Sequence, residues 1–373
     1  MLNRMISVLA AIGVAAPAAL VLSASVNAAD FKTTYDEIVA AAKKEDAVQW
    51  CTGMSPKESQ PIVDAFVALY PGVPEPNDFE CFSEDATQRV VAEWRAGATQ
   101  VDVLDTDTEI LETLDKQNLT HVQDWSIFDG TPVKIDPRYL SYKGRILSIG
   151  QAHRVIWYTP KILSYEDAPK SIDECADPKY KGILAADVRP TFFEFMKEAG
   201  GPWSDDKIRS WAAAMAKNEP LWIRGTSQAF QVLSSGERGL ICGHQLHGLF
   251  RSGRTKPNDP NAVVKYIIPK QSIVRDYIRL AIAPKPLAPN GTLLFSAFMA
   301  SNKGQTAIAD ANPGYASPYI DGSFTQIAIK KAGAKILQAP QEVLGPVTAK
   351  LKKLILTEWG FPTRVPKKKK KKK

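Results

Sequence analysis

Apolar and polar residues follow two alternating patterns along the chain, and the switches between them predict its elements. Over residues 31–44 apolar side chains recur at helical spacing, and residues 47–51 then form an apolar run typical of a buried strand. The same alternation continues to residue 104, with helices over 59–70 and 85–96 and strands ending near 81–83 and spanning 101–104.

A second series of this kind occupies the middle of the chain. It predicts strands over 182–186, 221–223 and 240–242 and helices over 192–199 and 228–233. Long extended stretches flank the series, 145–158 before it and 263–283 after it. A closing helix is expected over 343–359, where apolar residues return to helical spacing.

This order of elements predicts an α/β fold in two lobes. Strand–helix alternation favours parallel sheets covered by helices, so each series is expected to form a doubly wound lobe. The two extended stretches then act as hinge crossings between the lobes, and a ligand is held in the cleft between them. The expected boundaries are lobe 1 over 29–150, lobe 2 over 151–275, and a return to lobe 1 with the C-terminal helices over 276–366.

The first 28 residues have the features of a cleavable signal peptide. Arg4 precedes an apolar run over 5–22, and small residues then lead to a cleavage site after Ala28 or Ala29. A retained membrane anchor is the alternative, although Pro17 interrupts the run. The sequence therefore predicts an exported, periplasmic protein.

Composition and charge narrow the class of protein further. The 373 residues are 45% hydrophobic and 23% charged, which excludes a disordered chain, a collagen-like fibre and a small disulfide-stapled module. The net charge of +7 equals the contribution of the lysine tail over 367–373, for which we expect no role in ligand capture. No basic face remains, so nucleic acid is not an expected partner.

Four cysteines are spread along the chain without a Cys-x-x-Cys pair, which argues against a zinc ribbon or a thioredoxin site. In an oxidising compartment an even number favours disulfides. Cys51 and Cys81 each come late in a predicted strand and are the first expected pair, and Cys175 and Cys242 are the second. Buried free thiols are the alternative.

The loops at the carboxyl ends of the strands are where a ligand is expected, because open α/β sheets bind ligands there and against helix N-termini. These loops are 52–55, 83–85, 105–107, 187–191, 224–227 and 243–247.

Several phrases, in order, resemble one family over nearly the whole exported chain. They are AVQWCTG with VDAFVALYPGV, VDVLDTDTE with LDKQNL, HRVIWYTPKIL, PKSIDECADPKYKGILAADVRPT and LLFSAFMASNKGQTAIA. The chain resembles a periplasmic solute-binding protein of a bacterial ABC importer, of the extracellular solute-binding family 1 or ferric-iron-binding type, with the type II periplasmic-binding-protein fold. It departs from that pattern at Asn118, where glycine is more usual.

The resemblance implies a non-enzymatic receptor that closes on a solute and delivers it to an inner-membrane ABC permease. We expect a monomer without cofactors. The nucleophile elbow, the P-loop and the HExxH and GxGxxG motifs are all missing from the sequence. A periplasmic enzyme on the same scaffold is an alternative of a different class.

In the second lobe, the helix start near Arg189, Thr191 and Phe192 suggests an anion site. A helix N-terminus carries unpaired N–H groups, and an arginine fork suits carboxylate, phosphonate or phosphate. Arg224 and Thr226 open another helix and are a second candidate grip. The alternatives are an N-cap at Thr191, a core position for Phe192, and a plain cap beside a surface arginine at 224.

Two histidines stand where iron-binding members of the family have adjacent tyrosines. The stretch ICGHQLHGL places His244 and His247 there, and no tyrosine pair is present. These histidines could pack in the core, contact an organic ligand, or ligate a metal. Ferric iron or another metal is therefore the second expectation for the solute.

The first lobe contributes a set of residues at its strand ends, and the crossing strand adds one more. The candidates are Thr52, Gly53, Met54, Ser83, Asp105, Asp107 and Tyr158. An acidic pair would favour a ligand amine, hydroxyl groups or a cation, and helix capping is its alternative. Together with the second lobe, these residues predict a small anionic or zwitterionic organic solute.

Overall fold

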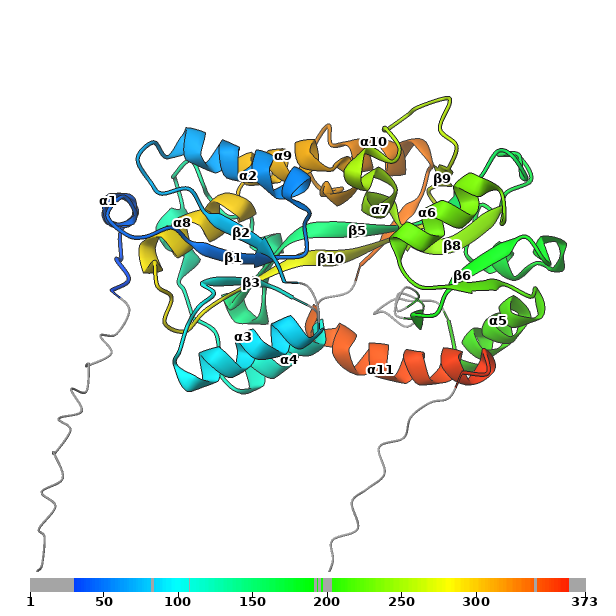
Figure 1. Cartoon of the computed structure of the whole chain (residues 1–373), viewed down its shortest axis with the longest axis horizontal. Helices are drawn as coiled ribbons and strands as arrows, with labels where there is room; N and C mark the ends of the chain where they lie inside the picture. The colour runs from blue at the N-terminus through cyan, green and yellow to red at the C-terminus, as the bar shows by residue number, and fades with distance from the viewer. Residues whose placement is uncertain are drawn as a thin grey trace, which may run out of the picture.

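One sheet of eleven strands runs through both halves of the molecule (Figure 1). The computed structural model describes residues 30–81, 84–106, 108–190, 193, 196, 203–338 and 341–361. The main strand order is β2-β1-β3-β10-β5-β8-β6-β7, so the long strands β5 and β10 lie between two parallel sets. This is the two-lobed α/β architecture that the sequence predicts.

The first lobe is built on three parallel strands, with β1 between the other two. They are β1 (Gln49–Thr52), β2 (Asn77–Glu80) and β3 (Val103–Asp105), with helices α1 (Tyr35–Ala42), α2 (Pro56–Leu69), α3 (Glu84–Ala96) and α4 (Thr108–Lys116). Helix α2 begins three residues before the expected start because Ser55 and Glu58 form a capping box around Pro56, a favourable first helical residue.

The second lobe repeats this plan, with β6 between two parallel neighbours. Its strands are β6 (Leu184–Asp187), β7 (Leu221–Ile223) and β8 (Leu240–Gln245), and its helices are α5 (Asp205–Lys217), α6 (Thr226–Ser235) and α7 (Leu246–Phe250). The helix expected over 192–199 lies mostly outside the described residues.

The two extended stretches form the antiparallel strands that join the lobes. Strand β5 (Ile146–Tyr158) is buried over its whole length and pairs with β8, whereas β10 (Gln271–Ile282) pairs with β3 and with β5. Short strands β4 (Leu140–Ser141), β9 (Lys265–Ile267) and β11 (Lys335–Leu337) extend this centre. Figure 1 shows both long strands crossing the middle of the molecule.

Single turns of 3-10 helix connect these elements. They are η1 (Trp125–Phe128), η2 (Pro137–Tyr139), η3 (Tyr142–Gly144), η4 (Asp173–Ala176), η5 (Pro178–Tyr180), η7 (Arg251–Gly253) and η8 (Pro313–Tyr315).

The chain after β10 divides between the lobes. Helices α8 (Pro289–Ala300) and α9 (Asn302–Ala311) pack on α1 and α2, and the ring of Phe295 lies against Trp50 and Phe66 in the core of the first lobe. They lie in lobe 1, where the sequence analysis expects them.

The C-terminal helix lies elsewhere. After α10 (Phe324–Lys331), α11 (Gln341–Glu358) contacts both α4 and α5 (Figure 1), and Leu351, Ile355 and Trp359 complete the core of the second lobe. The sequence analysis assigns 276–366 to lobe 1. It misses this packing because helical spacing shows that a face is apolar and not which core receives it.

Both cysteine pairs are disulfides, in the pairings that the sequence suggests. Cys51 and Cys81 lie 5.5 Å apart between Cα atoms, and Cys175 and Cys242 lie 6.3 Å apart. The first pair follows from the parallel register of β1 and β2. Within the described ranges, no helix has the length and apolar character needed to cross a membrane. The segment predicted as a signal peptide and the lysine tail lie outside those ranges.

Candidate functional site

The carboxyl ends of the parallel strands of both lobes point toward the junction between them (Figure 1). Strands β1 and β3 end there from the first lobe, and β6 and β8 end there from the second. We call the side chains gathered at this junction the strand-end site. The fold thus brings together the loops at which the sequence analysis expects a ligand.

Asp187, at the end of β6, is the hub of the second lobe's part of the site. Its Oδ1 accepts hydrogen bonds from the backbone N–H and the Nε of Arg189, both at 2.9 Å, and its Oδ2 accepts from Arg189 Nη2 at 2.7 Å and Gly225 N at 2.9 Å. Burial alone would raise the pKa of Asp187, but the arginine and the Gly225 amide lower the pKa below its ordinary value. Two of Arg189's guanidinium nitrogens therefore hold Asp187, whereas the sequence analysis expects that fork to face an anion.

His244 lies fully buried on β8, with its ring against the indole of Trp157 at 4.4 Å between centroids. Its Nδ1 accepts a hydrogen bond from the N–H of Gln245 at 2.9 Å, and its Nε2 lies 3.9 Å from Asp187 Oδ2. Burial lowers the pKa of His244 to about 3, although Asp187 opposes the shift. At neutral pH this histidine is an uncharged packing residue beside the Asp187–Arg189 pair.

Positive charge gathers around both histidines. Arg154, Arg189 and Arg254 each lower the pKa of His244, and Arg154 and Arg251 lower that of His247, after the larger effect of burial. Arg154 is itself a buried residue of β5. Among the described residues, Asp187 pairs with Arg189, and Glu58 of the first lobe lies near Arg251 and Arg254. Within the described ranges, these four arginines outnumber the two carboxylates.

His247 is held between two tyrosines at the junction of the lobes. Its ring stacks on Tyr315 and lies tilted against Tyr277, each at 4.4 Å between centroids. Burial lowers the pKa of His247 well below its usual range. The η8 backbone approaches so closely that a Cβ on Gly314 would lie 2.3 Å from His247 Cα. Of the three roles that the sequence left open, this arrangement matches packing.

Asn312 and Arg251 join the lobes through Glu58. The Nδ2 of Asn312 donates to Glu58 Oε1 at 2.7 Å and to the carbonyl of His247 at 3.0 Å. Arg251 Nη2 donates to the carbonyl of Gly53 at 3.2 Å, and its Nε lies 3.5 Å from Glu58 Oε2. These contacts link α2 to the segment after α7.

The first-lobe candidates mainly make hydrogen bonds to the backbone or pack in the core of the lobe. Thr52 is buried and its Oγ1 accepts from Met54 N at 3.2 Å, and Met54 packs in the core of the lobe. Asp105 accepts from Gly53 N at 3.4 Å and from Arg279 N at 3.1 Å, so this carboxylate ties β1 and β10 to the end of β3.

The remaining candidates are more scattered. Arg224 is exposed, with its backbone N–H bonded to Gln228 Oε1, and Thr226 begins α6 against Gly248. Tyr158 is buried at the far end of β5, away from the strand ends. The candidates Ser83, Asp107, Thr191 and Phe192 lie outside the described residues.

Sequence reasoning missed the residues that carry most of the site's charge. Asp187 stands in an expected loop but was not singled out, and Glu58 lies just before the helix expected over 59–70. Arg154 gave a usable signal, because an arginine within the apolar run HRVIWY has to be buried in a strand. Arg251 gave none.

The described residues include no group of three or more histidine, cysteine, aspartate or glutamate side chains placed to hold a metal ion. Any metal carried by this part of the chain would therefore need other ligands.

Solved structures share this architecture at low sequence identity. Trichodesmium IdiA (FutA), in complex with iron and citrate ligands, is 17% identical with a TM-score of 0.64, over 85% of this chain and 100% of that one. A substrate-binding protein of an ABC transporter from Agrobacterium tumefaciens is 14% identical with a TM-score of 0.62, over 84% and 94%. The Atu4243 GABA receptor is 14% identical with a TM-score of 0.62, over 86% and 99%.

The chain has the periplasmic-binding-protein fold. Other structures that share it are named as ferric-binding proteins. No protein-family model matches the chain, and no curated protein matches its sequence. The fold expectation drawn from the short phrases is confirmed.

Proposed function

We propose that this protein is the periplasmic substrate-binding component of an ABC importer. The binding-protein fold supports this role, and so does the meeting of both lobes' strand ends at one site. The signal-peptide pattern of residues 1–28 supports export to the periplasm. An inner-membrane permease is the partner that the role requires, and the receptor acts as a monomer.

The solute we propose is a small organic anion or zwitterion bearing a carboxylate, phosphonate or phosphate. The observation that carries this proposal is the excess of arginine at the strand-end site, where Arg154, Arg251 and Arg254 accompany the Asp187–Arg189 pair. Guanidinium groups in a partly buried setting bind such anions through charge-assisted hydrogen bonds. The solute binds without chemical change.

Ferric iron is the second candidate, favoured by the Trichodesmium structure with iron and citrate. The described residues offer no protein-only metal set, so iron would enter as an anionic complex whose carboxylates meet the arginines. Both candidates therefore use the same positive charge.

Isothermal titration of the exported chain distinguishes the candidates, with dicarboxylates, phosphonates, sugar phosphates, citrate and ferric citrate as separate probes. We expect one class of organic anion to bind, and Arg254→Gln to weaken binding about tenfold through loss of a charged contact. Arg209→Gln, which changes an exposed arginine on α5, is the matched control. Binding of ferric citrate, with no binding of citrate alone, would favour iron as the solute. Turnover of any probe, or binding unaffected by Arg254→Gln, would contradict the proposal.

A further inference from the structure

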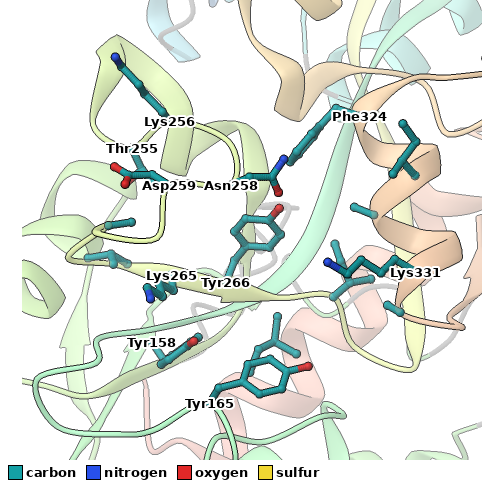
Figure 2. A pocket seen from close by; sticks show the side chains of 17 residues that line it. Tyr158, Tyr165, Thr255, Lys256, Asn258, Asp259, Lys265, Tyr266, Phe324 and Lys331 are labelled. Carbon is teal, nitrogen blue, oxygen red and sulfur yellow. The ribbon is translucent and has the colours of Figure 1, made fainter.

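A hollow lies between β9, the loop before it and α10 (Figure 2). Its volume is about 750 Å³, within the range of small-molecule sites. Its walls contain none of the charged residues of the strand-end site described above. Tyr158, which the sequence analysis expects near the ligand, lines this hollow instead.

Aromatic side chains form much of its surface. Tyr266 comes from β9 and Phe324 from the first turn of α10, with 6.4 Å between their ring centroids. Tyr158 and Tyr165 line the hollow on the other side of β9 (Figure 2). Such rings offer flat apolar contact to a ligand ring at small entropic cost.

The charged side chains of the hollow are mainly cationic. Lys256, Lys265 and Lys331 line it, and Asp259 is the single acidic residue among the described lining residues. Within the described ranges none of the three ammonium groups has a hydrogen bond or an ion pair, and Figure 2 shows Lys331 extending from α10 into the space. Asp259 Oδ1 accepts instead from the backbone N–H of Asn261 at 2.9 Å.

A buried hydroxyl adds a directional polar group to the wall. Thr255 is 8% exposed, and its Oγ1 has no hydrogen-bond partner among the described residues. A buried hydroxyl without a partner costs free energy, which a bound acceptor would recover.

We propose that this hollow binds a small aromatic carboxylate, separately from the solute of the strand-end site. The ligand's ring packs against Tyr266 and Phe324, which lie on one face of β9, and its carboxylate lies at Lys331. Thr255 donates a further hydrogen bond. A neutral or cationic ring would leave the lysine charge uncompensated and binds more weakly.

The test is calorimetric titration of the exported chain with phenylacetate, and with phenylethylamine as the cationic analogue. We expect saturable binding of phenylacetate with a Kd below about 1 mM and none of the amine. Lys331→Ala should weaken phenylacetate binding about five- to tenfold. Lys330→Ala is the matched control, because Lys330 is the preceding residue on α10 and does not line the hollow.

Arg251→Gln separates this proposal from the proposed function, because Arg251 belongs to the strand-end site. Phenylacetate affinity should be unchanged in that variant. Loss of binding in Arg251→Gln with normal binding in Lys331→Ala would place the probe at the strand-end site and overturn the inference. Equal binding of the amine, or no saturation by phenylacetate, would overturn it as well.

Discussion

Arg251, from the turn after α7, lies 3.5 Å from the carboxylate of Glu58 on α2 and so connects the two lobes. Glu58 also closes the capping box of α2, with its Oε2 accepting from Ser55 N at 3.0 Å, and it receives a hydrogen bond from Asn312. A single buried carboxylate therefore joins a helix start, the η8 turn and the opposite lobe. Changes at Arg251 should act on the closure of the lobes more than on their folding.

Replacing Arg251 by glutamine removes the ion pair and leaves the capping box of α2 intact. The pair is partly exposed, so we expect the free energy of unfolding in urea to fall by only about 1 kcal/mol. The lobes should separate more easily, which small-angle scattering of the unliganded protein would detect as a larger radius of gyration. Arg209→Gln removes an ion pair to Glu358 at 3.5 Å, away from this lobe-to-lobe contact, and should leave the radius unchanged. An unaltered radius in Arg251→Gln would contradict a bridging role.

Asp187→Asn tests the hub of the strand-end site. The substitution weakens the bonds to Arg189 and Gly225, and because Arg189 is 39% exposed we expect a loss of about 2 kcal/mol at pH 7 rather than the larger cost of a fully buried pair. The pKa of Asp187 is lower in the folded than in the unfolded protein, so its stabilisation is complete above the unfolded pKa and is lost as the pH falls through the folded value.

Urea unfolding of both proteins between pH 7 and pH 3 measures this dependence. The difference in free energy between wild type and Asp187→Asn should shrink toward pH 3. A difference that stays constant over that range would show that the carboxylate's charge does not stabilise the fold.

The sequence predicts the fold well because the fold depends on periodicity. Short apolar runs in the sequence predict the buried strands β1, β3 and β8. The unusual length of two extended stretches predicts the crossing strands β5 and β10. The destination of α11 does not follow from pattern, since Leu351 and Trp359 would suit the core of either lobe.

The structure brings the expected loops together at the strand-end site, but the contacts of individual residues there do not follow from the sequence pattern. Arg189 is an anion-binding residue by type, yet its partner is decided by the position of Asp187 two residues earlier. Met54 follows a strand end, yet its side chain turns into the core. Such outcomes depend on side-chain direction and on contacts between distant segments, which spacing along the chain does not encode.

The disulfides should contribute unequally to stability. Cys175 and Cys242 are separated by 67 residues and join η4 to β8, whereas Cys51 and Cys81 are separated by 30. Loop-closure entropy gives each bridge about 4 kcal/mol, with the longer loop the larger by under about 1 kcal/mol. Paired Cys→Ala variants compared by guanidinium unfolding should therefore both be less stable, and the Cys175–Cys242 variant the more so. Parent-like stability in either variant would contradict this order.

Acid should destabilise the protein through its buried histidines. His153 is fully buried, its Nε2 donates to the carbonyl of Ala316 at 2.9 Å, and burial lowers its pKa to about 4 despite that bond. The unfolded chain protonates this ring near pH 6.5 and the folded chain does not, so stability is complete above pH 6.5 and falls as the pH drops toward 4, by about 1.4 kcal/mol per pH unit. His153→Gln should be less stable at pH 7.5 but should show a shallower fall between pH 6.5 and 5, measured by urea unfolding at each pH. Other groups titrate equally in both proteins. Equal slopes of unfolding free energy against pH would therefore mean that His153 binds its proton as readily in the folded as in the unfolded state.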